Sequence, residues 1–437
     1  MTRTPPADTR KAQRCDAPAS GSLVLIGGAL DEDPAILQRI VALTAGAPGE
    51  MNAFEGHASE RAPRIAILTT ASEPAASAAD AASPTSENDE ADGRYYVELF
   101  ARHGAVGVPI PVGSAPKPLF EGASYHRGVA TDAQIAESVR TCDGVFFGGG
   151  DQTHYVLALF RSDDPAQPPF AQRHDTAVMA AIREVLDRGG VIAGTSAGLA
   201  VQQAAPMVSG GTSREGWLHG ASAGYEDDDA LRFIPAGGLG FFPEGLLDSH
   251  FNEWGRVTRA IRLAHATQER LAIGVDEHTA LVYSPGRRSG EVIGTGGVTI
   301  LDFAEAEFAD GPAGLGVIGV RWTHLTAGDR FDFERGESTP ASAAYVAPGT
   351  GDVPASVHDV WSENRGTALL HLAQQLLASP DHQATADTAR DSAVTDTAVD
   401  HGPRFRVILD RDERTMWTNP GGFTDLRLSI TSVSSAA

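Results

Sequence analysis

The strongest chemical signal in the chain is a serine flanked by small residues. The segment Gly194-Thr-Ser196-Ala-Gly198 follows the pattern G-x-S-x-G, and the apolar run Val191-Ile-Ala leads into it. On a sharp strand-to-helix turn, glycine neighbours accommodate a strained serine backbone, and the hydroxyl rises out of the sheet. The free N–H groups at the start of the following helix favour a developing oxyanion. The motif predicts Ser196 as a nucleophile, although a serine that only caps a helix would give the same letters.

A serine hydroxyl needs a general base, which is usually a histidine. The chain has 14 histidines, so their number alone selects none. His250 follows the run Gly245-Leu-Leu-Asp-Ser249 and precedes Phe251 and a stretch with helical spacing. This context predicts that it lies on a turn at the end of a secondary-structure element. His154, two residues after Gln152, is the second candidate.

A carboxylate must orient the imidazole and stabilise its cation. Asp276 and Glu277 follow the apolar run Leu271–Val275 and could end a strand. A polar turn would give the same letters, and only the combination with Ser196 and His250 favours Glu277. The order is then Ser, His, Glu, whereas an α/β-hydrolase runs Ser, acid, His. The ordinary esterase fold is therefore disfavoured.

Oxyanion stabilisation requires backbone N–H donors, one of them typically from the residue after the nucleophile. That residue is Ala197. The glycines Gly148-Gly149-Gly150 end another apolar strand and could supply a second donor, because glycine lets a backbone N–H approach a ligand closely. A tight turn without a ligand fits these letters equally well. Phosphate binding is disfavoured, because no lysine follows as in a P-loop.

The elements that must position these residues alternate between strands and helices through the first two thirds of the chain. This alternation predicts an α/β protein with a mainly parallel sheet. Strands are expected at 23–26, 64–70, 106–112, 144–147 and 190–194, and helices at 34–44, 95–103, 131–140, 175–188 and 254–268. Residues 209–235 are predicted to be loop and surface structure.

The pattern changes after residue 300, which predicts three regions. Residues 1–20 are expected to form a disordered arm, 21–300 a catalytic α/β domain with a flexible acidic insertion at 72–93, and 301–437 a β-rich extension. The strands expected in and around the extension are 297–303, 316–321, 404–409 and 423–433, with a disordered linker at 379–401.

Composition excludes several classes of function. The net charge of −23 repels phosphate backbones, so nucleic acid is not expected as a partner. No stretch approaches the roughly 18 apolar residues that a membrane span needs, and the N-terminus does not match a signal peptide. A cytoplasmic location is therefore expected. With only Cys15 and Cys142, neither a disulfide framework nor a zinc site is expected.

Five segments together resemble the cyanophycinase family of serine peptidases, which is related to peptidase E (α-aspartyl dipeptidase). They occur in the family's order across roughly residues 22–285. They are Ile26-Gly-Gly-Ala29, Phe146-Phe-Gly-Gly-Gly-Asp-Gln152, Gly194-Thr-Ser-Ala-Gly198, Asp248-Ser-His-Phe251 and Gly274-Val-Asp-Glu277.

The resemblance implies a three-layer, flavodoxin-like fold similar to the class I glutamine amidotransferase domain. It implies Ser196 as nucleophile, His250 as base and Glu277 as its orienter, and Gly149 or Gly150 with Ala197 as the oxyanion hole. Substrate would be bound by Gln152, Asp248, Ser249, Arg256 and Arg259. The implied reaction is hydrolysis of cyanophycin, a polyaspartate that carries arginine on each β-carboxyl, to β-aspartyl-arginine dipeptides. The resemblance implies no metal or organic cofactor. It implies a homodimer.

Two positions depart from the family's pattern. Ser249 replaces a glutamine, and Trp254 stands where an arginine is expected. These departures leave open a peptidase E-like enzyme for α-aspartyl or isoaspartyl dipeptides. A non-catalytic ligand-binding homologue is a third hypothesis. A glutamine amidotransferase is disfavoured, because its nucleophile is a cysteine.

Overall fold

A computed structural model describes thirteen stretches of the chain: residues 21–30, 33–46, 61–83, 90–163, 172–225, 230–311, 314–341, 352–353, 357–358, 360–361, 366–388, 404–418 and 421–433. The predicted arm at 1–20 lies outside the described residues. So do residues 84–89 of the predicted insertion and 389–401 of the predicted linker.

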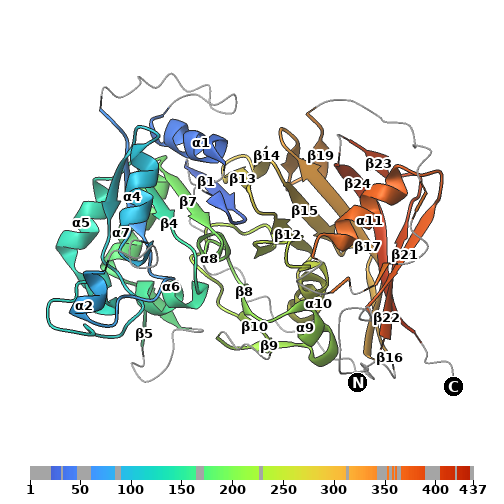
Figure 1. The fold of residues 1–437 in the computed structure, drawn as a ribbon, viewed down its shortest axis with the longest axis horizontal. Helices are drawn as coiled ribbons and strands as arrows, with labels where there is room; N and C mark the ends of the chain where they lie inside the picture. Colours follow the sequence, from blue (N-terminus) through green and yellow to red (C-terminus); the bar gives the residue numbers. More distant parts are fainter. Residues whose placement is uncertain are drawn as a thin grey trace, which may run out of the picture.

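A large mixed sheet combines strands from the N-terminal half of the chain with strands that lie between residues 279 and 339 (Figure 1). Within the described residues its strand order is β19-β18-β14-β13-β1-β7-β4-β2-β3. The five strands from β1 to β3 run parallel, and those on the other side of β1 are antiparallel. The prediction of an α/β fold with a parallel-containing sheet is confirmed. The strands are β1 (Ser22–Ile26), β2 (Arg64–Leu68), β3 (Val106–Pro109), β4 (Gly144–Phe147), β7 (Val191–Thr195), β13 (Thr279–Ser284), β14 (Ser289–Gly294), β18 (Arg330–Asp332) and β19 (Glu337–Thr339).

Helices cover both faces of this sheet. Successive strand residues point to opposite sides, and because both sets are apolar, each face needs a layer of helices to bury it. In β1, Leu23 and Leu25 pack in a core with the helices α5, α6, α7 and α8, whereas Val24 and Ile26 pack in another core with α1 and α4. The result is three layers. The helices are α1 (Pro34–Thr44), α4 (Arg94–Ala101), α5 (Ala133–Arg140), α6 (Gln152–Leu159), α7 (Ala177–Asp187) and α8 (Ala197–Ala200), with a 3₁₀ turn η3 (Arg127–Thr131) before α5.

A second sheet lies beside the first in Figure 1, with its C-terminal strands in orange and red. Its order is β11-β12-β15-β17-β24-β22-β21-β20, with β16 on β17 and β23 on β24. Helices α10 (Val257–Thr267) and α11 (Ala368–Leu377) share its apolar core. The strands are β11 (Leu246–Asp248), β12 (Leu271–Val275), β15 (Gly297–Asp302), β16 (Glu307–Gly311), β17 (Gly314–Thr326), β20 (Val357–His358), β21 (Gln383–Asp387), β22 (Arg404–Asp410), β23 (Met416–Trp417) and β24 (Phe423–Val433).

The strand pairing does not divide at residue 300, so the predicted boundary is wrong. β15 spans that position and pairs with β12 on one side and β17 on the other. The later strands β18 and β19 return to the first sheet. Hydrophobic patterning revealed the strands after 300 but not their partners, because pairing between distant segments leaves no local signal. The linker prediction also began too early, since β21 lies within 379–401 and pairs with β22.

Two further segments predicted as surface loops contain regular structure. The stretch 209–235 holds α9 (Ser213–His219), β9 (Ala221–Ala223) and β10 (Leu231–Ile234), and the last two form a small sheet with β8 (Met207–Gly210). Trp217 of α9 is buried against Trp361 and Phe405. The insertion contains the short helix α2 (Ala78–Ala81), which Ser77 caps. The remaining described strands, β5 (Phe160–Ser162) and β6 (Arg173–Asp175), form a hairpin pair.

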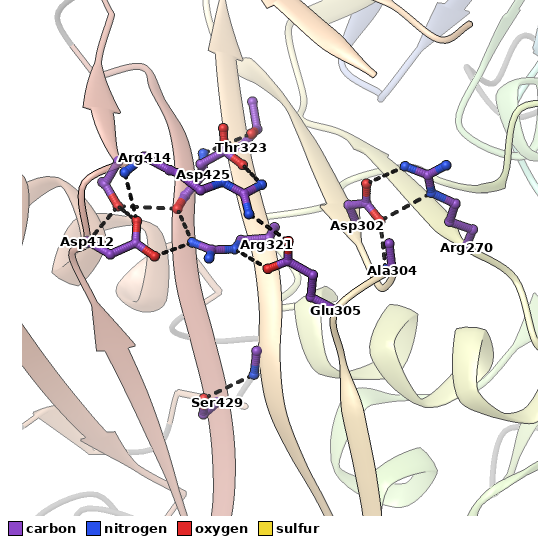
Figure 2. A network of polar contacts seen from close by, with 12 residues as sticks. Arg270, Asp302, Ala304, Glu305, Arg321, Thr323, Asp412, Arg414, Asp425 and Ser429 are labelled. Atoms are coloured by element: carbon purple, nitrogen blue, oxygen red, sulfur yellow. Dashed lines mark hydrogen bonds and ion pairs between the residues drawn. The ribbon is translucent and has the colours of Figure 1, made fainter. Parts of the chain in front are cut away.

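A network of ion pairs covers part of the second sheet (Figure 2). Arg321 of β17 lies 3.2 Å from Glu305 and 2.6 Å from Asp412, and Arg414 lies 2.7 Å from Glu305 and 3.1 Å from Asp425. These contacts join the loop before β16, strand β17 and the turn after β22. Linked charges restrain one another more effectively than isolated exposed pairs do.

Candidate active site

The nucleophile elbow forms where β7 ends and α8 begins. Ser196 has the backbone angles φ 54° and ψ −113°, which L-residues rarely adopt and which mark stored strain. Glycines on either side are required by packing: a Cβ on Gly194 would overlap the carbonyl oxygen of Gly198, and a Cβ on Gly198 would overlap that of Phe147. The local sequence therefore produces the strained turn that G-x-S-x-G predicts.

His250 lies within hydrogen-bonding distance of the serine. It follows β11 with φ 44°, and its Nε2 is 2.8 Å from Ser196 Oγ. The other histidine considered, His154, instead places Nδ1 3.2 Å from the carbonyl oxygen of Ala71. The structure thus brings His250, and not His154, to the predicted nucleophile.

Glu277 completes the arrangement on the turn after β12. Its Oε1 is 2.7 Å from His250 Nδ1, so the imidazole bridges serine and carboxylate. An N–H at Nδ1 donating to this carboxylate would leave Nε2 free to accept the serine proton. Burial lowers the pKa of His250, and this outweighs the bond to Glu277, which raises it. A lowered pKa favours the neutral imidazole, which is the form that can accept a proton.

The end of β1 holds all three segments in register. The carbonyl oxygens of Ile26, Gly27 and Gly28 accept the backbone N–H groups of Ser196 at 3.0 Å, His250 at 2.9 Å and His278, the residue after Glu277, at 3.0 Å. Three consecutive residues thus anchor Ser196, His250 and the turn that carries Glu277.

Gly28 also approaches the base directly. It has φ 145°, and a Cβ built there would lie 2.6 Å from His250 Nδ1. The sequence singled out this Gly-Gly pair as a family segment but assigned it no role. The pair of glycines directly after a buried strand was the available signal, since such glycines mark a close approach of backbone to another group.

The predicted oxyanion donors surround the serine. Gly149 is its neighbour, because a Cβ on Gly149 would lie 3.6 Å from Ser196 Cβ. Ala197 is the first residue of α8, where a helix leaves its N–H without an intrahelical acceptor. Gly150 has φ 124°, and a Cβ there would overlap the carbonyl oxygen of Ala71.

Three of the residues predicted to bind substrate are buried, namely Asp248, Ser249 and Arg259. Arg259 holds Asp248 through Nη2 to Oδ1 at 2.6 Å and Nε to Oδ2 at 2.7 Å, and Arg256 Nη1 adds a contact of 3.1 Å. Burial alone would raise the pKa of Asp248, but the charges of Arg259 and Arg256 lower it. This conformation therefore assigns Asp248 and Arg259 to holding β11 against α10, and it does not place them to touch a substrate.

Trp254 occupies the accessible side of the base. It is 42% exposed, and its ring stacks on His250 at 5.0 Å between centroids. The Arg256 guanidinium lies 4.7 Å from the centre of the same indole. Gln152, at the start of α6, donates from Nε2 to the carbonyl oxygen of Val208 at 3.1 Å. The sequence marked Trp254 as a departure from the family, and the structure places it next to the base.

Among the residues that the structure describes, no group of three or more His, Cys, Asp or Glu side chains could hold a metal ion. No described helix is long and apolar enough to cross a membrane. Cys142 is a buried free cysteine, whereas Cys15 lies outside the described ranges.

Comparison with known proteins places cyanophycinases among the sequence relatives of the chain. The chain is 34% identical over 218 residues to the cyanophycinase of Trichormus variabilis, covering 48% of this chain and 63% of that protein. It is 35% identical over 172 residues to the cyanophycinase of Geminocystis herdmanii, covering 39% and 53%. The chain thus spans less than two thirds of the length of these curated relatives. The sequence similarity supports a cyanophycinase-like family.

Two other comparisons add context. No protein-family model matches the chain. Among solved structures, a peptidase from an acI-B1 actinobacterium aligns with a TM-score of 0.44 and 20% identity, over 74% of this chain and 97% of that one.

Proposed function

We propose that the chain is a serine peptidase of cyanophycinase type that cleaves aspartyl peptide bonds through an acyl-enzyme on Ser196. The observation that carries the proposal is the continuous hydrogen-bonded arrangement of Ser196, His250 and Glu277, with contacts of 2.8 Å and 2.7 Å. The similarity to curated cyanophycinases supports the substrate class. We propose further that the three-layer part is a class I glutamine amidotransferase-like fold and that the protein acts in the cytoplasm as a homodimer.

The reaction follows from this arrangement. Ser196 Oγ attacks the carbonyl carbon of the scissile bond while its proton passes to His250 Nε2. The N–H groups of Ala197 and of Gly149 or Gly150 stabilise the oxyanion. His250 then gives its proton to the leaving amine, and the C–N bond breaks to leave an acyl-enzyme. A water molecule, deprotonated by His250, attacks the ester, and the acid product leaves as Ser196 regains a proton.

Glu277 remains ionised throughout these steps. Its carboxylate keeps the Nδ1–H tautomer and stabilises the imidazolium that forms twice in each cycle. A strained serine and an imidazole held from both sides reduce the reorganisation needed before attack.

A second candidate function is an α-aspartyl or isoaspartyl dipeptidase with the same machinery. The exposed Trp254 beside His250 favours it, and so does the buried Asp248–Arg259 pair. Both leave fewer free arginine groups near the base than a substrate rich in carboxylates would require. A non-catalytic binding protein is a third possibility, against which the intact Ser–His–Glu arrangement argues.

The test is release of β-aspartyl-arginine from purified cyanophycin by the wild type and by Ser196→Ala. The proposal predicts release that the substitution abolishes. Turnover of aspartyl dipeptides alone would instead select the dipeptidase. Unchanged hydrolysis by Ser196→Ala would refute the role of the serine in either enzyme.

A further inference from the structure

The turns that carry His250 and Glu277 exchange hydrogen bonds with each other. The carboxylate of Asp276 accepts the backbone N–H of Asn252 at 3.1 Å, and the carboxylate of Glu253 accepts the backbone N–H of Glu277 at 3.2 Å. Asp276 thus precedes Glu277 and binds the backbone two residues after His250, whereas Glu253 lies three residues after His250 and binds the backbone of Glu277 itself. We refer to these two reciprocal contacts as the carboxylate brace.

The second sheet holds one side of the brace. Asp276 exchanges backbone and side-chain bonds with Gly297 of β15, at 3.0 Å and 3.2 Å. The Asn252 side chain donates to Asp276 at 2.8 Å and to Thr299 at 3.3 Å, and Thr299 in turn contacts His324 of β17 at 3.1 Å. Asp276, Asn252, Thr299 and His324 are all buried. The region after residue 300 is therefore linked to the catalytic turns through side chains with little freedom to move.

Burying the carboxyl groups of the brace is energetically unfavourable for the fold. Burial raises the pKa of Asp276 well above its usual range, and the charge of Glu253 raises it further. Apolar side chains of similar volume would generally stabilise a fold as well or better. Carboxyl groups in such environments cluster at functional sites. Neither acid contacts the side chain of His250 or Ser196 in the described hydrogen bonds. Both instead bind the backbone of the turns that carry His250 and Glu277, which indicates a positioning function.

We propose that Glu253 and Asp276 are positioning residues that lock the His250 turn against the Glu277 turn, and that β15 and β17 of the second sheet secure this lock. The proposal rests on the proposed function, because the position of His250 matters through the reactivity of Ser196. Both imidazole contacts must be held at once. A displacement of about 1 Å at a catalytic group can cost on the order of 100-fold in rate.

The main experiment compares Glu253→Ala with Glu253→Gln. Glutamine keeps an oxygen that can accept the Glu277 N–H, whereas alanine removes it. Alanine is expected to lower kcat and the rate of phosphonate labelling of Ser196 by about 10- to 100-fold with KM unchanged. Glutamine should restore most of the rate. The matched control is Asp332→Ala, which removes a carboxylate acceptor of two backbone N–H groups, each at 3.0 Å, after β18.

The contribution of the second sheet is tested with Thr299→Val. This change removes the partner of Asn252 and His324 but leaves both Asn252 contacts to Asp276. A smaller fall in kcat, about three- to ten-fold, is expected. An unchanged rate in a variant whose unfolding curve matches the wild type would refute the part assigned to β15 and β17.

A readout without turnover separates this proposal from the proposed function. The proton between His250 Nδ1 and Glu277 should give a far-downfield proton resonance, assigned by its loss in His250→Gln. It should persist in Glu253→Gln and broaden or shift in Glu253→Ala. An unaltered resonance and wild-type labelling in Glu253→Ala would overturn the brace. If the wild type is never labelled, the proposed function fails, and the resonance still decides whether the brace positions His250.

Discussion

Replacing Gly28 by alanine should displace the imidazole of His250 while leaving all three catalytic side chains in the protein. The added Cβ would lie 2.6 Å from His250 Nδ1 and 3.0 Å from Nε2, with Cε1 closer still. Ordinary contacts of this kind need about 3.5 Å, so the imidazole or the β1 end must shift by roughly 1 Å. A shift of the imidazole would break its contact with Ser196 at 2.8 Å or with Glu277 at 2.7 Å, and a shift of the β1 end would displace the backbone of Ser196, His250 and His278, which it binds.

The expected loss is on the order of 100-fold in kcat and in the rate at which a phosphonate labels Ser196. The φ of 145° at Gly28 adds about 1 to 3 kcal/mol of backbone strain. Gly104→Ala controls for that strain, because Gly104 has φ 85° and nothing within 4 Å of a built Cβ. The control should lose stability but keep its labelling rate. Wild-type labelling by folded Gly28→Ala would refute the claim that β1 positions the base.

Three further predictions concern the acid, the base and the buried ion pair. Glu277→Gln should lower kcat by on the order of 10³- to 10⁴-fold, because the imidazole loses its tautomer and its counter-charge; a fall under ten-fold would remove Glu277 from the mechanism. The pH profile of kcat/KM should rise as His250 loses its proton, with a midpoint below pH 6.5, because burial lowers the pKa of this histidine from that value; a midpoint above 6.5 would contradict the burial argument. Arg259→Leu should lower the free energy of unfolding in urea by about 3 kcal/mol, because the buried Asp248 loses its main partner. Arg270→Leu should lower it by less than about 1 kcal/mol, because the arginine side chain of that ion pair is 68% exposed. Equal losses in the two variants would show that burial does not set the difference.

The parallel part of the fold was predictable because its strands are short, mostly apolar and separated by helical stretches. The strands predicted at 144–147 and 190–194 correspond to β4 and β7, which the structure pairs in parallel. The region after 300 was harder. Its strands were visible as alternating patterns, yet their assignment to two sheets depends on pairings such as β14 with β18, for which no local residue gives a signal.

The segment 209–235 shows a different limit. Its glycines, serines and charges suggested loops, and propensity alone gave no reason to expect the buried Trp217 of α9. Packing against Trp361 and Phe405, far along the sequence, stabilises this helix. Tertiary contacts outweighed local composition there.

Within the site, motif chemistry indicates Ser196, and the sequence context of His250 and His154 makes them the two candidate bases. The choice between Asp276 and Glu277 could not be made from spacing, because adjacent residues on a turn point in different directions. The structure directs Glu277 to His250 and Asp276 to Asn252. Arg256 and Arg259 show the reverse problem: their positions suggested recognition of carboxylates, but an internal carboxylate, Asp248, already occupies them.

The most direct test of the account maps a serine-directed phosphonate on the intact protein by peptide mass spectrometry. The account predicts one adduct, on Ser196, that is absent from Ser196→Ala and forms at least about 100-fold more slowly in His250→Gln. An adduct on another residue, or no adduct on a folded wild type, would contradict the claim that His250 activates Ser196.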